Sequence, residues 1–275
     1  MAYSFEYYES LMTGFNEIAN TVEAQGEGYR GIIPEGWRQG RTAYGGLTAG
    51  LSLIAARKQF PDLPPFRSAT INFIGPVAGD PVFTSRILRQ GRNVTSVETE
   101  GTVDGKPVSS CTFIFAAQRS STIRVDYPAP DAPLPASCEL FTPPAAKDFV
   151  PGFFDRFDTR LIAGSRPMSG ADEGYIRTWS RHRDLSSREG IASLLTLGDV
   201  LPPAALPLFK QMGPVSSVNW IFTVLTDDPK TQEGWWHVET KLTAALGGYS
   251  TQVMRIWNTD GQLIAEGMQC VAIFM

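Results

Sequence analysis

Two stretches of alternating apolar and polar residues, one in each half of the chain, form its clearest pattern. Residues 91–115 read GRNVTSVETEGTVDGKPVSSCTFIF, and residues 247–274 read GGYSTQVMRIWNTDGQLIAEGMQCVAIF. Each stretch holds an Asp-Gly pair between alternating runs, which predicts a β-hairpin because a type I′ turn needs positive φ at both central residues. Asp104-Gly105 and Asp260-Gly261 lie equally far into their stretches, so the hairpins align without a gap. We interpret the chain as an internal repeat.

The repeat extends upstream into one more strand and one helix in each half. Residues 69–73 and 216–220 are matching strand candidates, with an offset that is shorter by nine residues than that of the hairpins. Ahead of them lie LTAGLSLIAARKQF, which follows Gly45-Gly46, and SSREGIASLLTLGDVLPPAAL. Both runs are apolar around most of a helical circumference, so we expect two buried helices. Ser187 is the expected N-cap of the second helix, which Pro202-Pro203 ends or kinks.

A proline-rich stretch separates the two halves. It runs from about residue 119 to residue 151 and predicts an extended, semi-rigid linker. We therefore expect an N-terminal half over residues 1–118 and a C-terminal half over residues 152–275. Each half would place one helix on one face of a strongly curved antiparallel sheet, which is an α+β arrangement.

Composition and charge exclude several classes of function. The 275 residues carry a formal net charge of −4, and their lysines and arginines are scattered, so nucleic acid is not an expected partner. No apolar run approaches the roughly 20 residues that span a bilayer, and the first residues lack the pattern of a signal peptide, so we expect a cytoplasmic protein. Three separated cysteines give no disulfide framework, and two histidines are too few for a histidine-built metal site. We predict no metal and no cofactor.

The order of these elements, with Gly-Arg-Thr-Ala-Tyr-Gly-Gly at residues 40–46 leading into a buried helix, resembles the hotdog fold. The duplication resembles the double-hotdog acyl-CoA thioesterases of the thioesterase II type. This resemblance implies a double hotdog, in which one continuous curved antiparallel sheet wraps two buried helices and acyl-thioester sites form where the halves meet. It also implies a catalytic acid on the second helix, a hydroxyl on the next strand and a glutamine near the C-terminus. These features fall on Asp199, Ser217 and Gln269.

The sequence departs from the family after the two matching strands. Bacterial members carry His and Arg-Pro there, whereas this chain has Phe-Ile-Gly-Pro at residues 73–76 and Phe-Thr-Val-Leu at residues 222–225. The departure bears most directly on substrate preference.

The chemistry of thioester hydrolysis fits these residue types. A water must be oriented near the carbonyl carbon, and donors must face the developing oxyanion. Asp199 lies among leucines, where an unpaired carboxylate is costly, although it could instead cap the chain at the Pro-Pro break. The expected oxyanion donors are backbone N–H groups of Gly45, Gly46 and Leu47, because the first N–H groups of a helix are unpaired. Tyr44 is expected to line the acyl entrance, with a place in the core as the alternative.

The repeat also predicts how many sites the chain holds. The hairpin offset places Phe113 at the position of Gln269, and the shorter offset places Ser52 and Thr70 at the positions of Asp199 and Ser217. The complete polar set therefore occurs once, which predicts one catalytic site per chain.

We expect the protein to be an enzyme of lipid metabolism that hydrolyses acyl-CoA to a free acid and CoA. The alternative is a non-catalytic protein that binds an acyl thioester or another hydrophobic ligand in the same groove. A hotdog enoyl-CoA hydratase is less favoured, because neither His182 nor His237 lies five residues from a helix aspartate. Members of the family commonly associate, so a homo-oligomer is compatible with the sequence.

Overall fold

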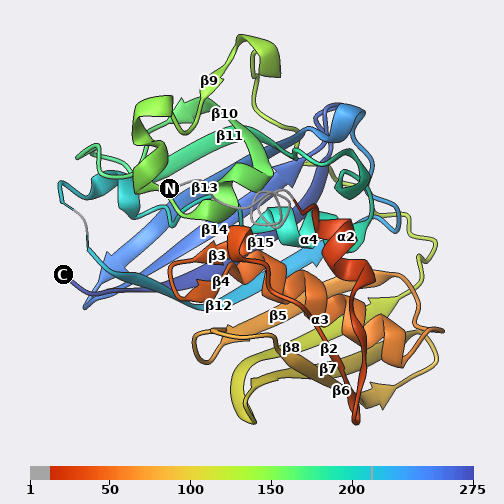
Figure 1. Ribbon diagram of the computed structural model, residues 1–275. Helices are drawn as coiled ribbons and strands as arrows, with labels where there is room; N and C mark the ends of the chain where they lie inside the picture. The colour runs from red at the N-terminus through yellow and green to blue at the C-terminus, as the bar shows by residue number, and fades with distance from the viewer. Residues whose placement is uncertain (1–12, 212) are drawn as a thin grey trace.

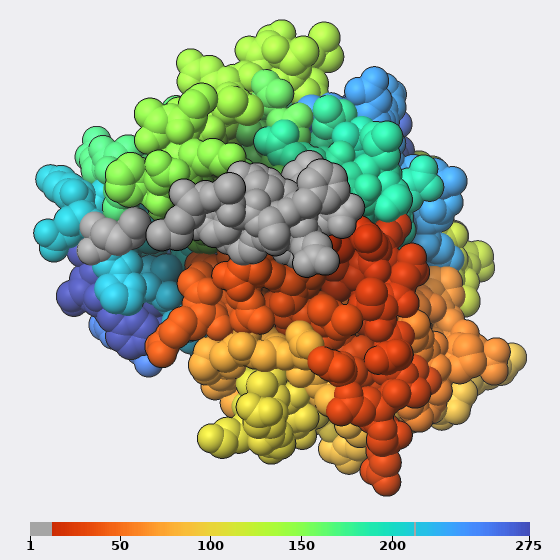
Figure 2. Space-filling view, in the orientation of Figure 1, coloured from red at the N-terminus to blue at the C-terminus, as the bar shows by residue number. Residues whose placement is uncertain are grey.

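A single antiparallel sheet of 13 strands runs through the computed structural model, which describes residues 13–211 and 213–275. The strand order is β1-β2-β6-β7-β8-β5-β12-β15-β14-β13-β11-β10-β9. The two halves of the chain meet at its centre, where β5 pairs with β12 over Ser68–Asn72 and Asn219–Thr223. The sheet curls around two helices, α3 and α4, which pack on each other (Figure 1). Figure 2 shows the red to yellow atoms of the N-terminal half on the lower side of this body and the green to blue atoms of the later residues on the upper side.

The elements of the N-terminal half are α2 (Phe15–Asn20), β1 (Glu23–Gln25), β2 (Gly28–Arg30), β3 (Arg38–Gln39), β4 (Thr42–Ala43), α3 (Gly45–Gln59), β5 (Phe66–Phe73), β6 (Val82–Gln90), β7 (Val94–Val103) and β8 (Lys106–Ala116). Those of the C-terminal half are β9 (Glu139–Leu140), β10 (Phe157–Gly164), β11 (Tyr175–His182), α4 (Ile191–Gly198), β12 (Val215–Val224), β13 (Trp236–Leu246), β14 (Tyr249–Trp257) and β15 (Leu263–Ile273). No helix of the described residues is long and apolar enough to cross a membrane.

Both expected helices are present and buried, but the second begins later than predicted. The N-cap of α4 is Gly190, whose φ of 88° is a conformation that few residues other than glycine adopt. Ser187 instead lies in a preceding 3₁₀ turn, where its hydroxyl donates to the carboxylate of Asp184 at 2.6 Å. The helix ends at Gly198, and Asp199 is its C-cap. The prediction of Ser187 as N-cap is therefore wrong, because its side chain is committed to Asp184.

The gapless alignment of the two hairpins is wrong by one residue. The β7–β8 turn has two residues with positive φ, Asp104 and Gly105, as a type I′ turn requires. The β14–β15 connection is longer, and within it only Gly261 has positive φ. The strand register shows the consequence: Val97 pairs with Phe113 in the first hairpin, and Gln252 pairs with Gln269 in the second.

The register of the central strands also changes one predicted equivalence. Ser217 pairs with Val271 just before a β-bulge in β12, and Phe66 pairs with Phe115 just before a β-bulge in β5. The structural counterpart of Ser217 is therefore Phe66, whereas Thr70 lies exposed on the outer face of the sheet. The match of residues 69–73 with residues 216–220 is therefore wrong by four residues, because Ser217 corresponds to Phe66 and not to Thr70.

The proline-rich connection lies against the sheet. The indole N–H of Trp179 donates to the carbonyl of Pro133, and that of Trp257 donates to the carbonyl of Tyr127, both at 2.8 Å. The connection then forms the short edge strand β9 and two 3₁₀ segments, Pro144–Phe149 and Gly152–Arg156. These segments bring phenylalanine side chains back to the junction between the halves.

Candidate active site

Asp199, Ser217 and Gln269 come together at the junction of the two halves. Asp199 follows the last residue of α4, Ser217 lies on β12, and Gln269 lies on β15. The side-chain amide Nε2 of Gln269 donates to Asp199 Oδ1 at 3.0 Å and to Ser217 Oγ at 3.2 Å. The amide of Gln269 thus links two side chains that are distant in sequence: Asp199 lies 70 positions before it and Ser217 lies 52 positions before it.

The environment of Asp199 favours its neutral form. Burial raises the pKa of this carboxyl from 3.8 to about 7, while the hydrogen bonds from Gln269 and from the backbone N–H of Gly46 oppose the rise. The protein encloses the carboxyl except where it borders a cavity. Near neutral pH both protonation states are populated, which suits a group that accepts and returns a proton.

The Gly45-Gly46 pair allows the start of α3 to approach the end of α4. A Cβ atom on Gly45 would lie 2.7 Å from Asp199 Oδ2, and one on Gly46 would lie 2.3 Å from the carbonyl oxygen of Thr196. Any larger residue would force the two helices apart. The glycines therefore have a packing role beside the expected one of presenting backbone N–H groups.

Tyr44 precedes these glycines and is fixed on both sides. Its hydroxyl donates to the carbonyl of Thr196 at 2.8 Å, and its ring stacks on Phe153 with centroids 4.1 Å apart. The side chain is only 1% exposed, yet it lines the cavity. Tyr44 is therefore a core residue that also borders the cavity, and its place at an acyl entrance stays a prediction.

A cavity of about 1140 Å³ opens beside the three polar residues. Its wall is largely apolar and includes two phenylalanines of the proline-rich connection, Phe141 and Phe149, and two that follow it directly, Phe153 and Phe154. Residues 73–76, where the sequence departs from the resembled family, also line it. Of the expected oxyanion residues, Gly45 borders the cavity, whereas Gly46 and Leu47 do not, and the Leu47 side chain is fully buried in the core. The cavity can hold an apolar chain whose polar end meets Asp199.

Gln252 is a site residue that the sequence reasoning missed. Its Nε2 donates to Gln269 Oε1 at 2.8 Å, and its Oε1 accepts a hydrogen bond from the backbone N–H of Ala204 at 2.6 Å. The side chain is completely buried on β14. The gapless alignment hid this residue, because it placed Gln252 opposite Ser96 instead of Val97. Allowing one extra residue in the second turn would have revealed it.

The corresponding position in the N-terminal half is apolar. Val97 and Phe113 stand where the C-terminal half has Gln252 and Gln269, and Phe66 stands where it has Ser217. The hydroxyl of Ser52 donates to the Thr48 carbonyl within α3 at 2.8 Å. Among the described residues, this arrangement of polar side chains therefore occurs once.

Neither histidine reaches the cavity. His182 shares a 2.9 Å hydrogen bond with the carbonyl of Ser193 and packs against Phe157. His237 lies between the rings of Trp179 and Trp257, each 5.1 Å away. Burial lowers the pKa of both imidazoles to about 4, so both stay neutral at physiological pH. Within residues 13–211 and 213–275, no group of His, Cys, Asp and Glu side chains could hold a metal ion.

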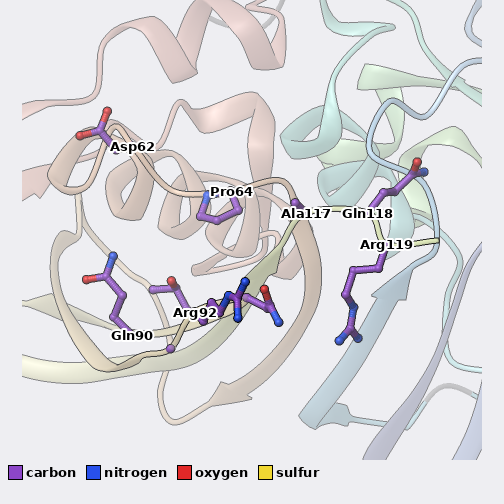
Figure 3. A pocket seen from close by; sticks show the side chains of 10 residues that line it. Asp62, Pro64, Gln90, Arg92, Ala117, Gln118 and Arg119 are labelled. Atoms are coloured by element: carbon purple, nitrogen blue, oxygen red, sulfur yellow. The ribbon is translucent and has the colours of Figure 1, made fainter. Parts of the chain in front are cut away.

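A second, smaller pocket of about 240 Å³ lies near the ends of β6 and β8. Figure 3 shows that its charged side chains, Asp62, Arg92 and Arg119, point in different directions. All three are exposed. The pocket therefore lacks the convergent polar groups of a binding site.

Two family models match most of the chain. Residues 33–116 match the family model described as acyl-CoA thioesterase N-terminal domain, and residues 135–273 match the model described as acyl-CoA thioesterase C-terminal domain. A search of curated proteins found no match.

Solved structures show the same fold at low sequence identity. A hot dog fold protein of unknown function from Alicyclobacillus acidocaldarius is 23% identical, with a TM-score of 0.85 over 96% of this chain and 99% of that one. A candidate thioesterase II from Thermobifida fusca YX is 20% identical, with a TM-score of 0.78 over 96% and 98%. An acyl-CoA thioesterase II from Mycobacterium marinum is 19% identical, with a TM-score of 0.73 over 94% and 98%. The predicted α+β double hotdog is confirmed.

Proposed function

Since the chain belongs to the acyl-CoA thioesterase family, we propose that it hydrolyses acyl-CoA thioesters to a free acid and CoA at the site formed by Asp199, Ser217 and Gln269. The observation that carries the proposal is the Asp199 carboxyl on the wall of an apolar cavity, hydrogen-bonded to an amide that also binds a hydroxyl. In this proposal the cavity takes the acyl chain, and acyl-CoA is the substrate partner in lipid metabolism. A cytoplasmic location and self-association stay predictions from the sequence.

The proposed reaction uses the ionised form of Asp199. The carboxylate accepts a proton from a water held beside Ser217 and Gln269, while the water oxygen bonds to the thioester carbonyl carbon. The C–S bond then breaks, and the proton on Asp199 passes to the departing thiolate. The products are a carboxylic acid and CoA, and Asp199 returns to its starting state.

The proposal places the oxyanion at the start of α3, beside the backbone N–H of Gly45. Gly45 borders the cavity directly. The N–H of Gly46 already donates to Asp199, so in the proposed site it would hold the base and lie next to the oxyanion. The developing negative charge would then meet fixed donors rather than bulk water.

The alternative function is non-catalytic binding of an acyl thioester, for which the apolar cavity alone would suffice. A hydratase is disfavoured by the positions of His182 and His237, since neither lines the cavity. Hydrolysis is favoured over binding because a binding site gains nothing from an enclosed carboxyl that is costly to ionise.

A thiol-release assay across acyl-CoA chain lengths tests the proposal. We expect turnover by the wild type, and a loss in kcat on the order of 10² or more for Asp199→Ala. Asp62→Ala, which removes an exposed carboxylate near the smaller pocket, is the matched control and should keep wild-type turnover. Full turnover by folded Asp199→Ala would refute the assignment. Acyl-CoA binding by the wild type without thiol release would favour the non-catalytic alternative.

A further inference from the structure

We propose that Gln252 is a positioning residue that fixes the amide orientation of Gln269, so that the NH₂ group of Gln269 faces Asp199 and Ser217. This inference rests on the proposed function of the Asp199 site. Gln252 itself does not contact Asp199 or Ser217 through any hydrogen bond described for it, and its partners are Gln269 and the backbone of Ala204.

The hydrogen bonds form one directed chain. The backbone N–H of Ala204 donates to Gln252 Oε1, Gln252 Nε2 donates to Gln269 Oε1, and Gln269 Nε2 donates to Asp199 and Ser217. A backbone N–H can only donate, and an ionised carboxylate can only accept. Both ends therefore impose the same direction on the two amides between them.

Without Gln252, no contact on the side of the Gln269 amide away from Asp199 would distinguish its carbonyl oxygen from its NH₂ group. The reversed orientation would turn its carbonyl oxygen toward the Asp199 carboxylate, which repels it and removes a donor from the base. Loss of Gln252 would leave the buried Oε1 of Gln269 without its donor, which weakens the preference for the orientation that serves Asp199. Gln252 removes this ambiguity by supplying a donor on the side away from Asp199.

The other half of the molecule shows that the fold does not require amides at this place. Val97 and Phe113 pair at the equivalent register of β7 and β8, and both are completely buried. The same sheet and helix packing is thus compatible with an apolar pair. Of these two equivalent places in the described part of the chain, the one beside Asp199 and Ser217 carries the amide pair, which points to the site rather than to the sheet.

Gln252→Met tests the inference, because methionine fills a similar volume without either hydrogen-bonding group. We expect kcat to fall about tenfold, as for the loss of one hydrogen bond in the transition state, with KM within about twofold of the wild type. The acid limb of the kcat/KM profile should move to higher pH, because the Gln269 hydrogen bond lowers the pKa of Asp199. Tyr44, whose pKa burial raises well above its ordinary value, stays neutral across this range.

Gln252→Glu provides a second variant with a distinct expectation. Its carboxylate can accept from Ala204 N–H but, when ionised, cannot donate to Gln269, so the Gln269 amide should reverse. We expect a larger loss of kcat than for Gln252→Met. Ser250→Ala is the matched control: Ser250 lies on the same face of β14, and its hydroxyl has no hydrogen-bond partner among the described residues. This control should keep the wild-type kcat and pH profile.

The outcomes separate this inference from the proposed function. A fall in kcat with an unchanged pH profile would indicate a general structural effect and would overturn the positioning role, as would wild-type kinetics in Gln252→Met. If the wild type released no thiol at all, the proposed function would fail. A carbon-detected NMR titration of Asp199 would still test whether Gln252 orients the Gln269 amide toward the Asp199 carboxyl. The Asp199 pKa should then be higher in Gln252→Met than in the wild type, and equal values would overturn the inference.

Discussion

Replacing Asp199 with asparagine should stabilise the folded protein while it removes the proposed base. In the unfolded chain this carboxyl ionises near its ordinary pKa of 3.8, whereas burial raises its pKa in the folded protein to about 7. Between these values the folded state holds the proton and the unfolded state does not. Wild-type stability therefore falls as the pH rises from about 4 to about 7, and the penalty is fully present above pH 7. Asparagine carries no charge and avoids the penalty.

The size of the stability gain in Asp199→Asn follows from the difference between the folded and unfolded pKa values of Asp199. A difference of about three pH units, at about 1.4 kcal/mol each, gives a ceiling of about 4 kcal/mol at pH 8. Solvation of Asp199 through the cavity reduces this ceiling. The asparagine also loses about 1 kcal/mol, because its NH₂ group cannot accept the hydrogen bond from the Gly46 N–H. The net gain should be on the order of 2 kcal/mol at pH 8 and should vanish or reverse at pH 4.

Urea denaturation of the wild type and Asp199→Asn at pH 4, 6 and 8 measures this difference. Asp62→Asn, which changes an exposed carboxyl, is the control and should show no comparable trend with pH. A free energy of unfolding for Asp199→Asn that is equal to or below that of the wild type at pH 8 would refute the reasoning. Asp199→Asn should also release no thiol. The same carboxyl would then both lower the stability of the wild type at pH 8 and act as the base of the proposed reaction.

Two further predictions follow from the contacts around Asp199. For the wild type, kcat/KM should increase with pH through an acid limb near pH 7, since the base must be ionised, and a limb near pH 4 would contradict the raised pKa. Gly46→Ala should lower the free energy of unfolding by about 1–3 kcal/mol, because its Cβ would meet the Thr196 carbonyl oxygen at 2.3 Å. Thermal denaturation checks this loss, with Gly105→Ala as a contrasting variant whose new Cβ would meet no neighbour but would strain a positive φ.

The resemblance to the thioesterase family predicted that Asp199, Ser217 and Gln269 lie together, and the structure joins their side chains by hydrogen bonds. Gln269 shares its face of β15 with Ala265, Gly267 and Val271, and all of these residues are buried. Parity along one strand needs no knowledge of its neighbours.

Relations between elements were predicted less well. The inward position of Gln252 depends on the length of the turn after Trp257, and the counterpart of Ser217 depends on an alignment of β5 with β12 that differs by four residues from the sequence match. A single inserted residue turns the side chains of a strand to the other face. Neither the inserted residue nor this alignment of the strands has a sequence signal strong enough to override the matches that the sequence offers. The lining of the cavity could not be predicted from the sequence either. Part of it comes from phenylalanines in and just after the proline-rich connection, where the sequence predicted only a linker.

The unequal lengths of the two helices explain why a duplicated fold has one complete polar site. Helix α3 continues over 15 residues, whereas α4 stops after eight. Because α4 stops early, Asp199 leaves the helix at its C-cap, and the chain through Pro202 and Pro203 forms part of the cavity wall instead of another helical turn. Helix α3 instead continues past Ser52, the residue that the sequence match paired with Asp199, and Ser52 is fully buried and donates to the Thr48 carbonyl within the helix. Apolar side chains at Val97 and Phe113 then fill the space that the amides occupy in the other half. The early end of α4 therefore places the carboxyl of Asp199 on the cavity wall, where the proposed reaction needs it.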